Sequence, residues 1–225
     1  MEMYHKIECP FKRSTDGSKQ IVWDKWRNPT VEFLKNNIWF FTEKVDGTNI
    51  RVHWDGHCVS FAGRTDKAKI PAMLNEYLTA TFKTNEVEEL FEQSFGEKEV
   101  TLFGEGYGAK IQGCGSAYRK DNSFILFDVM INGNYQSYET VEEIAEMLNI
   151  DVVPVVVIGT IYDAIEFVME HPKSTISQED LYMEGLVGRP MVELQDRCGH
   201  RLIVKIKWED FRQFANCDQG GNKVC

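Results

Sequence analysis

The apolar residues of this chain are gathered into short runs, most of which begin or end at a glycine or a charged residue. Examples are "IWFFTEKVDG", "VTLFGEGYG", "FILFDV" and "LIVKIKW". Short runs rich in β-branched and aromatic residues predict strands, and the glycines and acids at their ends predict turns. Residues 71–95 and 139–150 instead carry apolar residues at spacings of three and four, which predicts helices. Since strands and helices do not alternate regularly, we predict an α+β fold.

Further elements follow from local signals. Asp55-Gly56, inside "NIRVHWDGHCVSFAG", is typical of a β-hairpin turn. The run "VVPVVVIGT" predicts one buried strand, and residues 161–172 predict a helix that ends at Pro172. Residues 1–30 are polar with short apolar stretches, and we expect them to wrap the surface. The sequence has no internal repeat and no low-complexity linker, so we expect one domain over residues 1–225.

Charge and cysteine content exclude several classes of protein. The formal net charge is −10, with 35 acidic against 25 basic residues, so a global basic surface for nucleic acid is absent. A local cationic site remains compatible with this charge. The six cysteines form no C-x-x-C pair, which argues against a disulfide scaffold and a structural zinc site. The "CGH" at residues 198–200 lacks a second pair of ligands for zinc.

No apolar run approaches the roughly 20 residues that span a bilayer, and the N-terminal stretch has no apolar segment typical of a secretory signal. We therefore expect an intracellular, cytoplasmic protein without a membrane partner, and a monomer.

Lys44 lies in "FTEKVDGTNIRV", between an aromatic run and a tight turn. It is either a solvated hairpin lysine or a nucleophile. Other charged, glycine-flanked or aromatic positions are equally ambiguous when taken singly. Lys205 and Lys207 fit the wet face of an edge strand, and Glu105 and Glu184 fit solvated turns. Arg64 fits an exposed surface and Phe127 fits a core.

The ordered combination of these elements is more specific. "EKVDGTN", "GRTD", "FGEG", "LFDV", "EGLV" and "KIKW" together resemble the covalent nucleotidyltransferase superfamily. Within it, "EKVDGTN", "EGLV" and "KIKW" are similar to ATP-dependent RNA ligases of the branch shared by phage and RNA-editing enzymes. The resemblance covers residues 40 to 210, and it implies an α+β, ATP-grasp-like nucleotidyltransferase domain of antiparallel sheets flanked by helices. Relatives usually carry a further C-terminal domain, for which only about 15 residues remain here.

The resemblance also implies roles for individual residues. Lys44 is the residue that becomes adenylylated, Glu105 contacts the ribose of ATP, and Phe127 stacks on its adenine. Glu43, Asn49, Arg64 and Glu184 belong to the same nucleotide site, as do Lys205 and Lys207, which also support catalysis.

Elementary chemistry agrees with these roles. An ordinary lysine amine is protonated at neutral pH, and burial and neighbouring cations favour the neutral nucleophile. Alternation along a strand places Lys205 and Lys207 on one face, where they can supply such cations and neutralise departing pyrophosphate. Asp128 and Glu184 are hard oxygen ligands suited to Mg²⁺ or Mn²⁺. Asp46 and Gly47 shape the turn after Lys44.

We therefore expect an enzyme that forms lysyl-AMP and joins a 5′-phosphate to a 3′-hydroxyl of nucleic acid, with RNA as the expected substrate. A phage-infected host is one compatible setting. Two alternatives stay open: an mRNA-capping guanylyltransferase that uses GTP, and a noncatalytic nucleotide-binding module. Given the acidic chain, we expect weak, salt-sensitive substrate binding unless one group of basic residues forms a patch. These residues are Arg51, Arg64, Lys67, Lys69, Lys110, Arg119 and Lys120.

Overall fold

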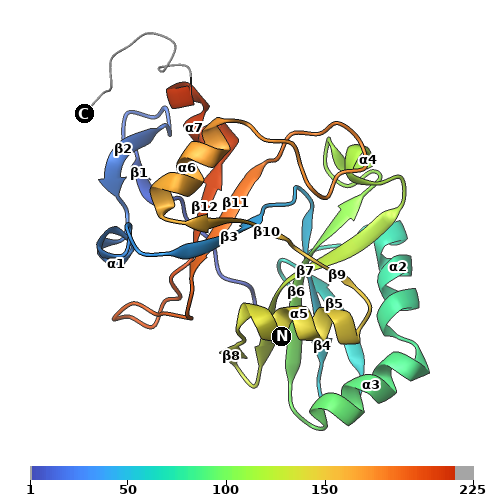
Figure 1. Cartoon of the computed structure of the whole chain (residues 1–225). Helices are drawn as coiled ribbons and strands as arrows, with labels where there is room; N and C mark the ends of the chain where they lie inside the picture. Colours follow the sequence, from blue (N-terminus) through green and yellow to red (C-terminus); the bar gives the residue numbers. More distant parts are fainter. Residues whose placement is uncertain (1, 216–225) are drawn as a thin grey trace. The chain divides into compact units, whose positions relative to one another are not determined.

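The computed structural model describes residues 2–215, and the chain divides into two compact units. Unit 1 comprises Val45–Val153, Ile176–Leu181 and the N-terminal residues up to His5. Unit 2 comprises Lys6–Lys44, Pro154–Thr175 and the chain from Tyr182 onward. Figure 1 shows the helices and strands of both units. Both units combine antiparallel sheets with helices, which confirms the α+β prediction.

Unit 1 is built on a sheet whose strands follow the order β5-β4-β6-β7-β8, with β9 parallel to β7. The predicted hairpin joins β4 to β5, and the Asp55 carboxylate closes its turn by accepting the backbone N–H groups of His57 and Cys58. The strands are β4 (Thr48–Trp54), β5 (Val59–Gly63), β6 (Val100–Gly108), β7 (Asn122–Ile131), β8 (Asn134–Tyr135) and β9 (Asp151–Val152).

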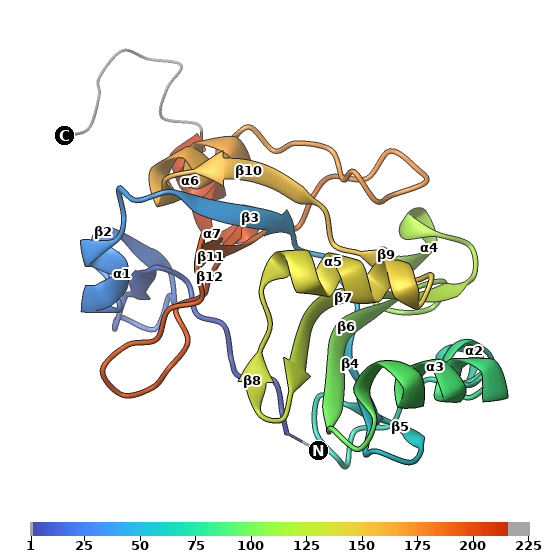
Figure 2. The same ribbon diagram turned by 60° about the horizontal axis from the view of Figure 1, so that its bottom comes forward.

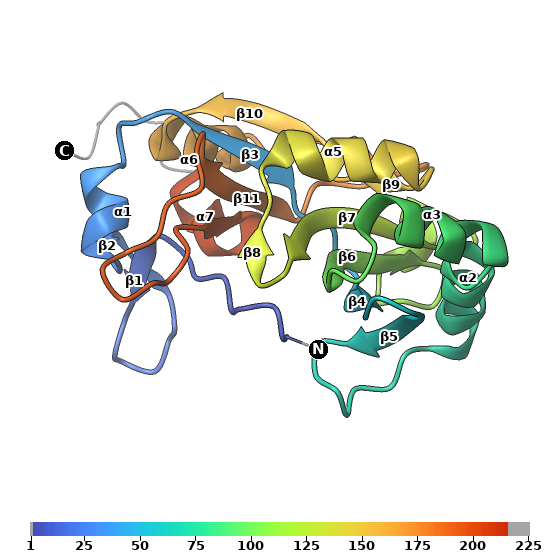
Figure 3. The same cartoon turned by 90° about the horizontal axis from the view of Figure 1, so that it is seen from below.

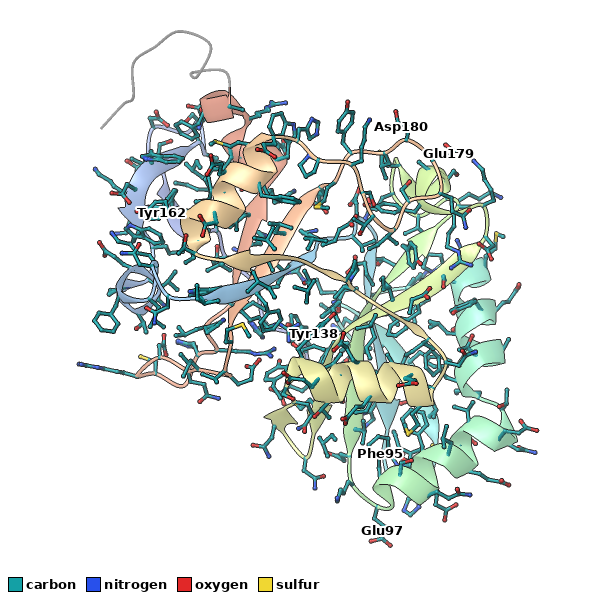
Figure 4. The ribbon with its side chains drawn as sticks, viewed as in Figure 1. Phe95, Glu97, Tyr138, Tyr162, Glu179 and Asp180 are labelled. Atoms are coloured by element: carbon teal, nitrogen blue, oxygen red, sulfur yellow. The ribbon has the colours of Figure 1, made fainter. Side chains whose placement is uncertain are left out.

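Three helices cover one face of this sheet, α2 (Ala72–Phe82), α3 (Asn85–Phe95) and α5 (Tyr138–Met147), as Figures 1 and 3 show. Their apolar side chains pack with alternate residues of β4, β6 and β7 into one core. The residues between those alternate positions therefore point to the opposite face. Tyr138, labelled in Figure 4, lies at the start of α5 and donates a hydrogen bond to the Val153 carbonyl.

The continuous helical pattern predicted over residues 71–95 is in fact two helices, α2 and α3. Thr84 ends the pattern because its side chain accepts the backbone N–H of Val87 and caps α3. A short helix, α4 (Gly115–Tyr118), follows β6.

Unit 2 is built on a four-stranded antiparallel sheet in the order β10-β3-β11-β12. Trp39, Phe41, Leu186 and Ile206 form a core on one of its faces with apolar residues of α6 and α7, and Phe211 of α7 is fully buried there. These elements are β3 (Trp39–Glu43), β10 (Val155–Gly159), β11 (Gly185–Pro190), β12 (Val204–Lys207), α6 (Ile161–Met169) and α7 (Trp208–Ala215).

The first 30 residues do more than wrap the surface, contrary to expectation. They form β1 (Phe11–Arg13), β2 (Ile21–Trp26) and the start of α1 (Pro29–Phe33), which lie together in Figure 2. Phe11 and Trp26 pack edge to face and are buried in the core of unit 2. This contribution is not evident from the sequence, because only Phe11 of β1 and Ile21 and Trp26 of β2 are buried.

The single strand predicted over "VVPVVVIGT" is also two strands. Pro154 separates β9, which pairs with β7 in unit 1, from β10, which pairs with β3 in unit 2. Proline has no N–H for a ladder, so a break at this residue is physically reasonable. None of the helices within residues 2–215 has the length and apolar character needed to cross a bilayer.

Candidate active site

Lys44 lies in a cluster of charged side chains at one end of the unit 2 sheet. It directly follows β3, Glu184 directly precedes β11, and Lys207 is the last residue of β12. Because β11 lies between β3 and β12, the three residues meet. Lys44 Nζ is 2.5 Å from Glu184 Oε2, and Lys207 Nζ is 2.9 Å from Glu184 Oε1. One carboxylate therefore bridges two ammonium groups, all of them partly buried.

The backbone reinforces this arrangement. The Lys44 N–H donates to the Gly185 carbonyl at 2.9 Å, and Gly185 pairs with Lys207 across β11 and β12. Gly185 has a φ of +154°, and a Cβ at this position would lie 2.1 Å from the Ile206 carbonyl oxygen. Glycine is thus required where the strand carrying Glu184 approaches the strand carrying Lys207.

Lys205 and Lys207 lie on the same face of β12, as predicted, because Val204 and Ile206 alternate with them and are buried in the core. Burial lowers the pKa of Lys205, and the charges of Lys44 and Lys207 lower it further. Burial alone would lower the pKa of Lys207 as well, but the hydrogen bond and charge of Glu184 raise it overall. Glu184 therefore stabilises the charged form of Lys207, whereas burial and the neighbouring charges make the charged form of Lys205 less favourable than in solution.

Replacing Lys205 by methionine is expected to stabilise the protein at neutral pH. In the folded protein the pKa of Lys205 lies below the ordinary value of 10.5. At a pH between the folded and the unfolded pKa, the unfolded chain therefore binds more protons than the folded protein, so the free energy of unfolding rises with pH in this range. Below both values the charged amine costs stability in full, and methionine removes this cost. Urea unfolding at pH 7 and pH 10 should show a gain for Lys205→Met that shrinks at the higher pH. The exposed Lys98→Met is the control, and an equal gain in both variants would contradict the assignment.

Glu43, predicted as a nucleotide-site residue, is almost fully buried. Its carboxylate accepts hydrogen bonds from the Ser174 hydroxyl, from the Thr175 backbone N–H at 2.8 Å and from the Thr175 hydroxyl at 2.6 Å. Both carboxylate oxygens are thus occupied by the segment after α6. Ser174 and Thr175 were missed from the sequence, where the only signal is the hydroxyl pair in "HPKST". A nucleotide contact for Glu43 stays a prediction.

Asn49, Glu105, Phe127 and Asp128 lie on the face of the unit 1 sheet opposite the helices, and Arg64, also in unit 1, directly follows β5. Asn49 of β4 is directly paired with Glu105 of β6. Asn49 Oδ1 is buried, and no residue in the described part of the chain donates a hydrogen bond to it. A buried acceptor without a donor costs free energy, so a donor on a ligand fits this position. A nucleoside, which carries hydroxyl and amino donors, has the required chemistry.

Phe127 is singled out by an irregularity in β7. Phe103 pairs with Asp128 and Gly104 pairs with Leu126, so the register of β6 and β7 shifts by one residue at Phe127. Such a bulge redirects the side chain of the extra residue. The Phe127 ring is only partly buried, and Tyr4 contacts it edge to face at 5.0 Å between ring centroids. These features are compatible with a ring that stacks on a base.

Asp128, predicted as a metal ligand, is fully buried in unit 1. One of its oxygens accepts a hydrogen bond of 2.7 Å from the Tyr4 hydroxyl. A buried, hydrogen-bonded carboxylate supports folding directly, whereas Glu184 is more exposed and better suited to a cation. The metal role of Asp128 therefore stays a prediction without support from its surroundings. Tyr4 was missed, since nothing in the sequence links residues so far apart.

Tyr4→Phe is expected to lower the free energy of unfolding by about 1–3 kcal/mol, because it removes a donor from a fully buried carboxylate. Urea denaturation measures the loss. Tyr135→Phe is the matched control, since its hydroxyl makes a longer contact of 3.3 Å with His5 in a less buried setting. A smaller loss is expected there. Equal losses in the two variants would show that the Tyr4–Asp128 hydrogen bond stabilises the protein no more than the Tyr135–His5 contact does.

The turn after Lys44 depends on glycine, as predicted. A Cβ at Gly47 would lie 2.4 Å from the Gly106 carbonyl oxygen and 2.8 Å from the side chain of Glu105. The start of β4 can therefore approach β6 closely beside Glu105. Asp46 is held by its backbone N–H, which donates to the Tyr118 hydroxyl.

Several of the basic residues proposed as a surface patch are buried or paired with acidic side chains. Arg64 is exposed directly after β5. Arg51 is fully buried and donates to the Gly63 carbonyl and the Asp66 carboxylate, so its assignment to a surface patch is wrong. Other members are paired with acids, as Arg119 is with Asp121 and Lys120 with Glu179.

The "CGH" segment lies in a tight turn, where donor atoms of Asp196, Cys198 and His200 come within 4.8 Å of one another. One Asp196 oxygen already accepts the backbone N–H groups of Cys198 and His200. The turn itself therefore accounts for the proximity of these three donor atoms.

Comparison with known proteins points to one family. A family model described as RNA ligase matches residues 37–207. Among solved structures, a Naegleria gruberi RNA ligase variant with ATP and Mn is similar, with 17% identity and a TM-score of 0.63, over 95% of this chain and 62% of the other. The same ligase with PPi matches at 19% identity and a TM-score of 0.61, over 83% and 54%. This chain thus spans only about half to three-fifths of those proteins. No match is found among curated proteins.

Proposed function

Because this chain belongs to the RNA ligase family, we propose that it is an ATP-dependent RNA ligase that works through lysyl-AMP at Lys44. The observation that carries the proposal is the bridge from Lys44 through Glu184 to Lys207, which holds an amine and two further charged groups together. A module that only binds a nucleotide has no need of a partly buried lysine positioned in this way.

The proposed reaction has three steps. The Lys44 amine attacks the α-phosphorus of ATP, so that a nitrogen–phosphorus bond forms, the bond to pyrophosphate breaks and the amine loses its proton. A 5′-phosphate oxygen of RNA then takes AMP from Lys44. A 3′-hydroxyl finally attacks that 5′-phosphorus and releases AMP. Positioning and charge stabilisation account for most catalysis of phosphoryl transfer. Lys205 and Lys207 supply positive charge for departing pyrophosphate.

Residues of unit 1 are assigned to the nucleoside. Phe127 stacks on adenine, Glu105 contacts the ribose, and Asn49 offers the buried oxygen that has no donor within the described chain. Arg64 is assigned to the phosphates. Stacking is tolerant of base identity, so the preference for ATP over GTP rests on the family and requires direct measurement.

A divalent cation, Mg²⁺ or Mn²⁺, would be held by Glu184, the hard oxygen ligand next to Lys44. When bound, such a cation neutralises phosphate charge. Glu184 must then release at least one of its two ammonium partners, and partly exposed ion pairs of this kind are weak enough to exchange. We retain Asp128 as a lesser candidate.

We further propose that residues 1–225 act as one nucleotidyltransferase domain and that the protein is an intracellular monomer. The family match supports the first point, since it extends through segments of both units.

Nucleotide labelling followed by strand joining tests the proposed function. The protein is incubated with α-labelled ATP or GTP and Mg²⁺, and label on the protein is measured; transfer from ATP alone is expected. Transfer from GTP alone would indicate a guanylyltransferase, and binding without transfer would indicate a noncatalytic module. The adenylylated protein is then given 5′-phosphorylated RNA, either single-stranded or at a nick in a duplex. Appearance of joined RNA with either substrate supports the proposal, and its absence with both contradicts it.

A further inference from the structure

His171 lies between two aromatic rings in unit 2. Its imidazole is 4.0 Å from the Trp208 ring at an interplanar angle of 8°, and 4.2 Å from the Tyr182 ring at 16°. The Lys173 ammonium lies 3.4 Å above the Tyr182 ring and closes the outer end of this stack. A nearly parallel stack of three rings with a cation at its end constrains the position of all three residues.

The stack joins three segments that meet beside Lys44. His171 follows the last turn of α6 with a φ of +53°, a left-handed conformation that is unfavourable for histidine and needs compensation from its surroundings. Tyr182 precedes Glu184 by two residues, and Trp208 directly follows Lys207. The backbone N–H of Trp208 donates to the backbone carbonyl of Glu184 at 3.0 Å.

A further backbone hydrogen bond joins the segment that carries His171 to the segment that carries Glu184. The Met183 N–H donates to the Pro172 carbonyl at 2.9 Å, so the residue after His171 is bound to the residue before Glu184. Tyr182 is thus two residues from Glu184, the partner of Lys44, and Trp208 is next to Lys207, the second partner of Glu184. A shift of the imidazole would move the segments that carry Glu184 and Lys207.

We propose that His171 is a positioning residue that holds Glu184 and Lys207 in register around Lys44 through the ring stack. This inference rests on the proposed function and adds to it a residue that acts through the segments carrying Glu184 and Lys207. The role requires a flat ring at position 171, and no proton transfer. Burial lowers the pKa of His171, and the charge of Lys173 lowers it further, which favours the neutral imidazole.

Replacement of the ring tests the proposal. His171→Leu should lower the rate constant for AMP transfer to Lys44 roughly ten- to hundredfold, because small displacements of positioning groups cost about this much. The KM for ATP should stay within about twofold of wild type, since unit 1 residues are assigned to the nucleoside. His171→Phe should restore most of the rate. His200→Leu, the same change at an exposed histidine of unit 2, should have no effect.

Several results would overturn the proposal: a wild-type rate in His171→Leu, equal losses in His171→Leu and His171→Phe, or a rise in KM alone. If His171→Leu does not fold, Tyr182→Leu replaces it, and a normal rate in that variant overturns the proposal.

A second measurement separates this inference from the proposed function. The rate at which an amine-reactive reagent modifies Lys44 is followed by mass spectrometry in the absence of ATP. Loss of the ring should increase modification of Lys44, and His171→Phe should match wild type. If wild type forms no AMP adduct, the proposed function fails, and these labelling rates still decide the positioning role: unchanged rates in His171→Leu contradict it.

Discussion

Lys44→Ala is expected to abolish the AMP adduct that the wild-type protein forms with ATP and Mg²⁺. Among residues 2–215, no other amine has the same relation to Glu184, because Lys207 binds the opposite carboxylate oxygen from the end of another strand. Intact-mass measurement after incubation detects the adduct. The variant should remain folded, since loss of a partly exposed ion pair costs at most about 1 kcal/mol.

Lys44→Arg separates charge from nucleophilicity. The guanidinium preserves an ion pair with Glu184 but remains protonated and does not attack phosphorus. It should therefore fold normally and form no adduct, whereas the exposed Lys98→Arg should form as much adduct as wild type. An adduct that persists in both Lys44 variants would place the covalent chemistry on a different residue.

The sequence was informative where chemistry and local geometry coincide. Lys205 and Lys207 were correctly predicted to lie on one face of β12, because side chains alternate between the two faces of any strand. Asp55-Gly56 predicted its hairpin because only a few residue pairs form such a turn.

Features that depend on tertiary partners were not predictable in the same way. Pro154 divides an apolar run between two sheets, and the identity of each pairing strand is set by residues far along the chain. The same applies to Asp128. An acid at the end of a buried strand resembles a metal ligand until its partner Tyr4, 124 positions away, is known.

In the candidate site, too, some residues were predictable from the sequence and others were not. Lys44, Glu184 and Lys207 were all predicted from the family resemblance, and Glu184 contacts both lysines. The residues around them were missed: Ser174 and Thr175 anchor Glu43, which precedes Lys44, and His171 stacks between two rings. Supporting residues carry no motif of their own, because a hydroxyl or a flat ring is useful there only in relation to its neighbours.

Gly185→Ala is expected to damage both stability and activity. A Cβ would lie 2.1 Å from the Ile206 carbonyl oxygen and 2.8 Å from the Lys207 Cα, and both contacts are with backbone that cannot rotate away. The φ of +154° adds strain for alanine, and such strain alone costs about 1–3 kcal/mol. Before the steric contacts are counted, this loss corresponds to a fall in Tm of roughly 2–12 °C.

The effect on activity should exceed the effect on folding. To relieve the contact, β11 must move away from β12, which separates Glu184 from Lys207 and weakens the bond from the Lys44 N–H to the Gly185 carbonyl. Adduct formation should fall by about a hundredfold at temperatures where the variant is fully folded. Gly113→Ala is the matched control, because a Cβ there meets no atom within 4 Å. Should Gly185→Ala retain wild-type Tm and adduct rate, close approach of β11 and β12 would not be what positions Glu184.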